Sequence, residues 1–151
     1  MEGKFEYAVD KSAAWGLKAL DLVNGHRINL DLPLLTWSST LHGLAYRHST
    51  SMALESIEFA SKNPQERKDS IDQIISRVSK SQEYVYRNSE ESTSRSVDLA
   101  MASWLLDDDI RSTIEGDFTQ FSTGIKVKEE FINVFEVSYE NYFTLLFAKI
   151  R

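Results

Sequence analysis

The spacing of apolar residues changes once along this 151-residue chain, close to Gly116. Before that glycine, apolar side chains recur three or four residues apart, which is the period of an amphipathic helix. After it, the pattern changes to that of strands. Helices followed by an antiparallel sheet predict the α+β class, with roughly three strands at residues 121–128, 131–138 and 142–150. The pair Glu140-Asn141 is expected to form the turn between the last two strands.

Two helices are expected in the first third of the chain. Residues 1–11 have a mixed composition and are expected to form a flexible lead-in, so that a single domain covers residues 12–151. Ser12 is a favourable N-cap for the first helix. This helix ends before Pro33, because proline cannot continue a helical hydrogen-bond ladder. Ser38 then caps a second helix.

Two further helices and a short strand are expected in the middle of the chain. The pair Asn63-Pro64 opens the third helix, with asparagine as N-cap and proline in the first turn. The apolar face of this helix consists of Ile71, Ile74, Ile75 and Val78. Residues 83–86 follow as a short strand. The apolar face of the fourth helix consists of Val97, Met101, Trp104 and Leu105. Asp109 is expected to cap a short helical turn after it.

Composition excludes several classes of function. The chain contains no cysteine, which excludes disulfides, thiolate metal sites and cysteine nucleophiles. The formal net charge of −6 disfavours nucleic acid as a partner, because binding nucleic acid needs a basic face. No run of about 18 apolar residues occurs, so no membrane span is expected. The first residues lack the apolar core of a signal peptide, which indicates either a cytoplasmic protein or a trimmed mature form.

Several segments carry a specific combination of residues. Within residues 20–53 these are Asn24, His26, Arg27, Pro33, Leu34, Trp37, Leu41, Ala45 and Met52. Later segments with such patterns are residues 104–111 and residues 117–121 followed by Gly124. In their order and spacing they resemble the CAP superfamily of cysteine-rich secretory proteins, insect antigen 5 and plant pathogenesis-related proteins, and in particular its cysteine-free bacterial branch. The resemblance implies a three-layer α/β/α sandwich.

The resemblance also implies a cleft in which the family places two histidines and a glutamate around a divalent metal. Ser61 and Ile110 stand at the histidine positions of this sequence, and Arg87 stands at the glutamate position. Asn88 keeps the asparagine of the family. Serine, isoleucine and a protonated guanidinium do not supply the nitrogen, sulfur or carboxylate donors that zinc requires. We therefore expect a degenerate cleft with no metal and no cofactor.

The other polar residues give no catalytic pattern. His42 and His48 are six residues apart and fall on opposed faces of one helix, so they are not expected to share a ligand. A functional histidine pair that includes His26 is a minor alternative. Asn24 and Arg27 are expected to tie the end of the first helix to nearby backbone carbonyls. No G-x-S-x-G motif is present, so no serine can be assigned as a nucleophile.

Aromatic residues crowd the C-terminal half of the chain, and most of them should form the core. Some CAP proteins hold sterols or fatty acids in apolar clefts between helices, so the resemblance implies a ligand of this kind. The candidate walls of such a groove are Leu17 and Leu20 on the first helix and Val97 and Met101 on the fourth. The alternative is that these residues simply pack on each other.

Together these features predict a non-enzymatic binding or interaction protein that is exported from the cytoplasm. Its partner is expected to be a sterol, a fatty acid, or a host or cell-surface protein. Export is implied by the resemblance, in which case the chain is the mature part of a secreted protein or of a surface-anchored lipoprotein. Two alternatives are a hydrolase or protease that uses the modified cleft, and a structural surface protein without a small ligand. The sequence defines neither the ligand nor the oligomeric state.

Overall fold

The computed structural model describes residues 2–54, 59–60, 64–75 and 77–150. Helices and strands follow one another in the α+β order that the apolar spacing predicts. The elements are α1 (Glu2–Asn29), β1 (Thr36–Trp37), α2 (Ser39–Ala53), α3 (Pro64–Ile74), β2 (Val78–Asn88), α4 (Thr93–Leu106), α5 (Asp108–Ile114), β3 (Gln120–Asn133) and β4 (Glu136–Ile150).

The sheet has the strand order β1-β3-β4-β2. Strands β3 and β4 form a long antiparallel hairpin, and β2 pairs antiparallel with the other edge of β4. The two-residue strand β1 adds a short parallel pairing to β3 at Gln120 and Phe121. The sheet is therefore four-stranded and mixed, whereas the sequence indicates roughly three antiparallel strands.

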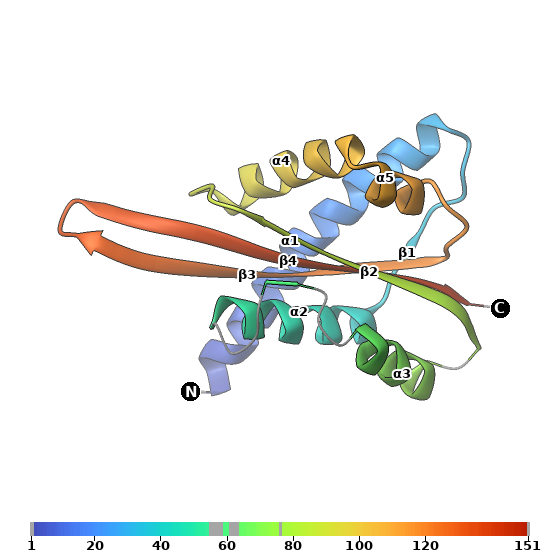
Figure 1. Cartoon of the computed structure of the whole chain (residues 1–151), viewed down its shortest axis with the longest axis horizontal. Coiled ribbons are helices and arrows are strands. Elements are labelled where there is room, and N and C mark those ends of the chain that lie inside the picture. Colours follow the sequence, from blue (N-terminus) through green and yellow to red (C-terminus); the bar gives the residue numbers. More distant parts are fainter. Residues whose placement is uncertain (1, 55–58, 61–63, 76, 151) are drawn as a thin grey trace.

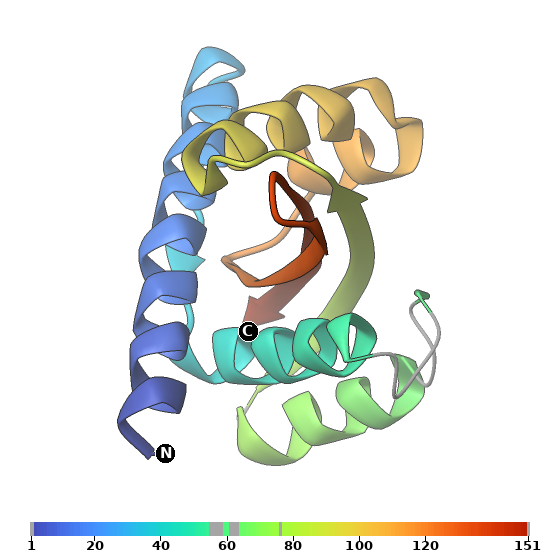
Figure 2. The ribbon, with the colours of Figure 1, turned by 90° about the vertical axis from the view of Figure 1, so that its left-hand side faces the viewer.

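The helices cover both faces of the sheet, as expected for a three-layer α/β/α sandwich (Figure 1). Helices α2 and α3 lie on one face, and α4 and α5 lie on the other (Figures 1 and 2). Helix α1 runs past the β3 side of the sheet and contacts both β3 and α4 (Figure 2). The expected fold class is confirmed.

Alternation along β4 distributes its side chains between two apolar layers. Phe143, Leu145 and Phe147 pack on the face covered by α4, while Leu146 and Ala148 pack on the α2 face. The side chains of these five residues are at most 1% exposed. Burying each large apolar side chain contributes about 1.5–3 kcal/mol, so the central part of β4 anchors both helical layers.

Two of the expected helix caps differ from those observed. Ser38 does cap α2, because its side chain accepts a hydrogen bond from the backbone N–H of Leu41. Helix α1, however, begins at Glu2, so residues 2–11 are helical rather than a loose lead-in and Ser12 lies inside the helix. Asp107 rather than Asp109 caps α5, and its carboxylate accepts two backbone N–H groups there. The expected cap Asn63 lies outside the described residues.

The strands are longer than expected, and the hairpin turn is elsewhere. Strand β2 has 11 residues and includes Val78, which the sequence assigns to a helix face. Strands β3 and β4 have 14 and 15 residues, and the turn between them lies at residues 134–135 rather than at Glu140-Asn141. Asn141 is fully buried within β4, where its side-chain amide donates to Oδ1 of Asn88 and to the carbonyl of Glu90. Asparagine is more typical of turns than of strands. Asn141 can nevertheless be buried inside β4 because its side-chain amide is hydrogen-bonded there.

One glycine permits the close packing of α2 on the sheet. A Cβ atom at Gly124 of β3 would overlap the backbone of Ala45 and Tyr46. The hydroxyl of Ser49 donates to the Gly124 carbonyl over 2.9 Å at the same contact.

Within the described ranges, no helix combines the length and the apolar content that a membrane crossing requires.

Candidate functional site

Two of the positions at which the resemblance predicts the family cleft, Arg87 and Ile110, lie apart in the structure. Arg87 on β2 pairs in register with Tyr142 of β4, and Tyr142 packs against Met52 on the α2 face. Ile110 belongs to α5 and is buried in the core on the opposite face. The sheet therefore lies between Arg87 and Ile110. Ser61 lies outside the described residues.

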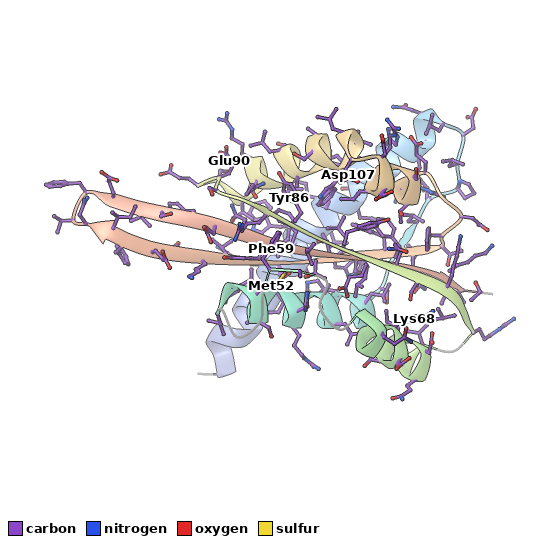
Figure 3. The ribbon with its side chains drawn as sticks, viewed as in Figure 1. Met52, Phe59, Lys68, Tyr86, Glu90 and Asp107 are labelled. Carbon is purple, nitrogen blue, oxygen red and sulfur yellow. The ribbon has the colours of Figure 1, made fainter. Side chains whose placement is uncertain are left out.

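Arg87 forms part of a compact aromatic cluster on the α2 face. Its guanidinium carbon lies 4.6 Å from the ring centroid of Phe59 and 6.0 Å from that of Tyr142. The two rings meet edge to face at a centroid distance of 6.2 Å. In Figure 3, Phe59 and Met52 are labelled toward the α2 side of the sheet, and Tyr86 of β2 toward the α4 side. A cation therefore packs on two aromatic rings at the position where the resemblance predicts a metal-binding carboxylate.

Tyr142 supplies the hydroxyl of this cluster. The hydroxyl donates a 2.6 Å hydrogen bond to Oε2 of Glu140, and the side chain is 4% exposed. Burial raises the pKa of Tyr142, the bond to Glu140 adds to this effect, and Arg87 opposes it. The phenol therefore stays protonated near neutral pH and acts as a hydrogen-bond donor.

His48 connects α2 to the segment that carries Phe59. Its side chain is 5% exposed, and its Nε2 lies 2.8 Å from the carbonyl oxygen of Ala60. A carbonyl accepts only, so Nε2 must carry the proton and donate. This hydrogen bond ties the imidazole to the backbone of Ala60.

Asn88, at which the resemblance predicts the family's asparagine, joins three elements. Its Nδ2 donates to the carbonyl of Ser96 over 3.0 Å, and the Ser96 hydroxyl donates to its Oδ1 over 2.6 Å. Asn141 of β4 donates to the same oxygen. Asn88 therefore fixes the end of β2 against α4 and β4.

Arg27 and Asn24, near the end of α1, hydrogen-bond to backbone groups of neighbouring segments. Arg27 is 2% exposed; its Nε donates to the carbonyl of Pro33, and one terminal nitrogen donates to the carbonyls of Ile114 and Gly116. Asn24 exchanges two hydrogen bonds with the backbone of Leu35. Burial lowers the pKa of Arg27, and the negative charge of Asp117 opposes this. Both residues tie the helix end to nearby backbone, as the sequence predicts.

The four residues of the expected apolar groove are mostly core residues. Leu20, Val97 and Met101 belong to one buried cluster between α1, α4 and the sheet. Leu17 is 44% exposed. Helices α1 and α4 are in contact, and none of the four residues lines either of the two cavities described next. A ligand between these helices would have to separate them.

Two cavities lie elsewhere in the described part of the molecule. One, of about 290 Å³, is bounded by the loop after α1 and the entry to β3, and Arg27 and Asp117 line it. The other, of about 270 Å³, lies where α1 passes β3 and is lined by Ser12, Trp15, Tyr46, Ile125, Val127 and Tyr139, among others. We refer to this second one as the β3-edge cavity.

A buried serine–histidine pair adjoins the β3-edge cavity, and the sequence does not reveal it. Ser12 Oγ lies 2.9 Å from Nε2 of His42, and the two side chains are 2% and 4% exposed. Burial lowers the pKa of His42, so its ring is neutral near pH 7. In the sequence, Ser12 has the signature of a helix cap, and only the packing of α1 on α2 brings it to His42.

Among the described residues, no group of three His, Cys, Asp or Glu side chains is placed to hold a metal ion. Four of the exposed large apolar side chains gather at the end of the β3–β4 hairpin. They are Phe131, Ile132, Val134 and Phe135, which are 62–94% exposed. Clusters of this kind on a soluble protein mark interaction surfaces.

Comparison with known proteins agrees with this fold. A solved extracellular protein of Bacillus anthracis str. Ames that contains an SCP domain superposes with a TM-score of 0.60 at 20% identity. That match covers 90% of this chain but only 40% of the other, so the chain spans less than half of that protein. An outer surface protein of Borrelia burgdorferi superposes with a TM-score of 0.57 at 18% identity, over 85% of this chain and 87% of the other.

Sequence comparison identifies the family directly. No curated protein shows significant sequence similarity to the chain. The profile of the cysteine-rich secretory protein family, CAP, matches residues 20–147, which include both helical layers and most of the sheet. The chain therefore belongs to the CAP family of cysteine-rich secretory proteins.

Proposed function

We propose that this CAP domain works outside the cytoplasm and acts by binding rather than by catalysis. Its membership of a secretory family supports this, as do its structural relatives, one described as extracellular and one as an outer surface protein. The partner is a protein on the host or cell surface, or an apolar lipid-like molecule. Attachment to the surface through a lipidated cysteine upstream of this chain belongs to the same proposal.

The observation that carries the proposal is a stacked cation, Arg87, at the position where the resemblance predicts the metal-binding carboxylate of the family. Arg87 lies over the ring of Phe59, and its positive charge repels a divalent ion at this position. Ile110 fills a core position on the far side of the sheet. Neither residue can take part in metal-dependent hydrolysis.

The alternative hydrolase function has one candidate feature, the Ser12–His42 pair. Its separation of 2.9 Å is within the range of a nucleophile and a general base. However, Ser12 Oγ also accepts the backbone N–H of Ile125 over 2.8 Å, and the side chain is 2% exposed. A hydroxyl engaged in this way is not available to attack a substrate, so we expect protease and esterase panels to be silent.

Activity assays on matched variants test the absence of catalysis. Hydrolysis that disappears in Ser12→Ala or Ser61→Ala, but persists in Ser112→Ala on the exposed side of α5, would establish the hydrolase and refute the proposal.

Location is tested separately, by protease treatment of intact cells that make the full-length protein. Protection of the domain in intact cells would contradict an extracellular role.

A lipid ligand between α1 and α4 is the second candidate, favoured by the apolar character of Leu20, Val97 and Met101. Titration with labelled sterol and labelled fatty acid measures it directly. Leu17 is the exposed member of the groove, so Leu17→Asp should weaken binding while the fold is retained. Leu106→Asp, at an 85% exposed position at the end of α4, serves as the control. If neither lipid shows saturable binding, a protein remains as the proposed class of partner.

A further inference from the structure

A cavity of about 290 Å³ lies at the end of α1. The loop after α1 forms one side of it, and the segment that joins α5 to β3 forms the other. Figure 1 shows both segments at the end of the molecule where α1 ends. Because Arg27 lines this cavity, we call it the Arg27 cavity. None of its wall residues belongs to the expected groove between α1 and α4 or to the expected family cleft.

Arg27 keeps two hydrogen-bond donors that the described part of the chain does not use. Its Nε donates to the carbonyl of Pro33, and its Nη1 donates to the carbonyls of Ile114 and Gly116. A guanidinium carries five N–H groups, so the two on Nη2 have no acceptor among the described residues. The side chain is 2% exposed and borders the cavity, so the cavity is the space through which an acceptor reaches Nη2.

The two carboxylates in the cavity wall already have partners within the chain. Asp117 accepts a hydrogen bond from Lys149, with which it forms an ion pair. Oε2 of Glu115 lies 2.8 Å from Nε2 of His26. Neither carboxylate lies within ion-pair distance of Arg27 among the described contacts. The charge of Arg27 therefore lacks a direct counter-ion in the described structure.

The cations around the cavity outnumber these carboxylates. Nζ of Lys80 lies 4.5 Å from the ring centroid of Phe118, which is part of the wall. The hydrogen bond from Lys149 lowers the pKa of Asp117 most, and the charges of Lys80 and Arg27 add to this. All three cations therefore act on one carboxylate. With histidine counted as neutral, three positive charges against two carboxylates leave one positive charge in excess.

The rest of the wall is largely apolar and encloses a small space. It includes Leu32, Pro33, Leu34 and Phe118. Liquid water occupies about 30 Å³ per molecule, so the cavity holds about ten non-hydrogen atoms. The acyl chain of a membrane lipid is too long for this volume, whereas a short aliphatic or aromatic acid fits.

We propose that the Arg27 cavity binds a small monocarboxylate, whose oxygens accept the N–H groups of Arg27 Nη2 and whose apolar part lies against Leu34 and Phe118. A carboxylate is favoured over a neutral carbonyl, because hydrogen bonds between charged groups are about twice as strong as neutral ones. It is favoured over phosphate, because one excess positive charge matches a monoanion and phosphate makes no use of an apolar wall. The site is independent of the partner proposed for the domain above.

Benzoate and benzamide are matched probes, since they have the same shape and differ in charge. Titration calorimetry at low ionic strength measures the affinity of each. We expect benzoate to bind with a dissociation constant on the order of 1 mM, and benzamide about tenfold more weakly. Equal affinity of the two probes, or no saturable binding of benzoate, would overturn the proposal. So would displacement of benzoate by equimolar inorganic phosphate, since the apolar wall would then contribute nothing.

Two variants of the wall locate the site. Leu34 is 58% exposed, so Leu34→Glu should retain the fold while its negative charge weakens benzoate binding about tenfold. Leu106→Glu, at an 85% exposed position outside the wall, is the matched control and should leave binding unchanged. Asp117→Asn removes a competing carboxylate and should strengthen binding about threefold. Unchanged affinity in Leu34→Glu, or weaker binding in Asp117→Asn, would refute the site.

Nitrogen-15 NMR identifies the contacting group without a variant of Arg27 that could fail to fold. The guanidinium signals of Arg27 should shift during the benzoate titration, and those of Arg111 on the exposed side of α5 should not. Arg27 signals that stay in place at saturating benzoate would contradict the proposed contact. Leu17→Asp, in the expected lipid groove, should leave benzoate binding unchanged. Loss of benzoate binding in that variant would assign the acid to the groove and not to the Arg27 cavity.

Discussion

The hydroxyl oxygen of Ser12 lies 2.9 Å from Nε2 of His42, across 30 residues of sequence and at the junction of three elements. The same oxygen accepts the backbone N–H of Ile125, so its own proton is free to be donated to the neutral imidazole. One small side chain thus links α1, α2 and β3. Because all of these groups are buried, each lost partner leaves an unsatisfied polar group in the interior.

Acid should destabilise the protein through His42. Burial lowers its pKa in the folded state below the ordinary value of 6.5, so at lower pH the unfolded chain binds a proton that the folded chain does not. The free energy of unfolding should therefore be fully retained above pH 6.5 and decrease as the pH falls through the folded-state pKa. Urea unfolding from about pH 7.5 to about pH 5.5 measures the slope. His42→Gln should give a shallower slope, and parallel curves for the two proteins would contradict this.

Removing the Ser12 hydroxyl should lower the free energy of unfolding. Ser12→Ala leaves the N–H of Ile125 without its acceptor in a buried position, at a cost of about 1–3 kcal/mol. Ser112→Ala, on the exposed side of α5, is the control and should change stability by less than about 0.5 kcal/mol. Equal stability of the two variants in urea titrations would show that Ser12 is not a structural link.

Trp104 should be the most costly side chain to truncate on α4. It is fully buried and meets Phe143 edge to face at a centroid distance of 5.9 Å. Trp104→Ala should cost about 3–5 kcal/mol in thermal or chemical unfolding. Trp104→Phe should cost less, because it also removes an indole N–H that has no described partner. A parent-like melting temperature for Trp104→Ala would show that α4 is not docked on the sheet.

Zinc should not change the stability of the protein. A metal that binds only the folded state raises the melting temperature by mass action, and Arg87 opposes such binding. Melting curves with micromolar zinc and with a chelator should therefore coincide. Arg87→Glu should not create a zinc response, since Ile110 lies on the other face of the sheet. A rise of several degrees in either protein would mean that metal ligands do meet there.

Local patterns predicted those parts of the fold that depend on neighbouring residues. Ser38 caps α2 through the N–H of Leu41, three residues away, and Val97 and Trp104 face the core at helical spacing. Arg27 binds carbonyls near its own helix end, as expected. The family resemblance supplied the layer order, which periodicity alone does not define.

The hairpin turn could not be predicted, because its physical cause is non-local. Asn141 has the side chain of a turn residue, yet it is buried within β4 by bonds to Asn88 and Glu90, which are more than 50 residues away. Val134 and Phe135 have no turn signal and are apolar, yet they lie at the exposed tip. Pairing of two long strands places the turn where the register requires it.

The sequence by itself determined that this chain has no thiol chemistry, because the absence of cysteine is a property of composition. It also determined the family, through the order of residues within 20–147. Only the tertiary structure decided that Arg87 and Ile110 lie on opposite faces of the sheet and that Ser12 meets His42. These relationships depend on strand register and helix packing, where free energy comes from contacts between residues distant in the chain.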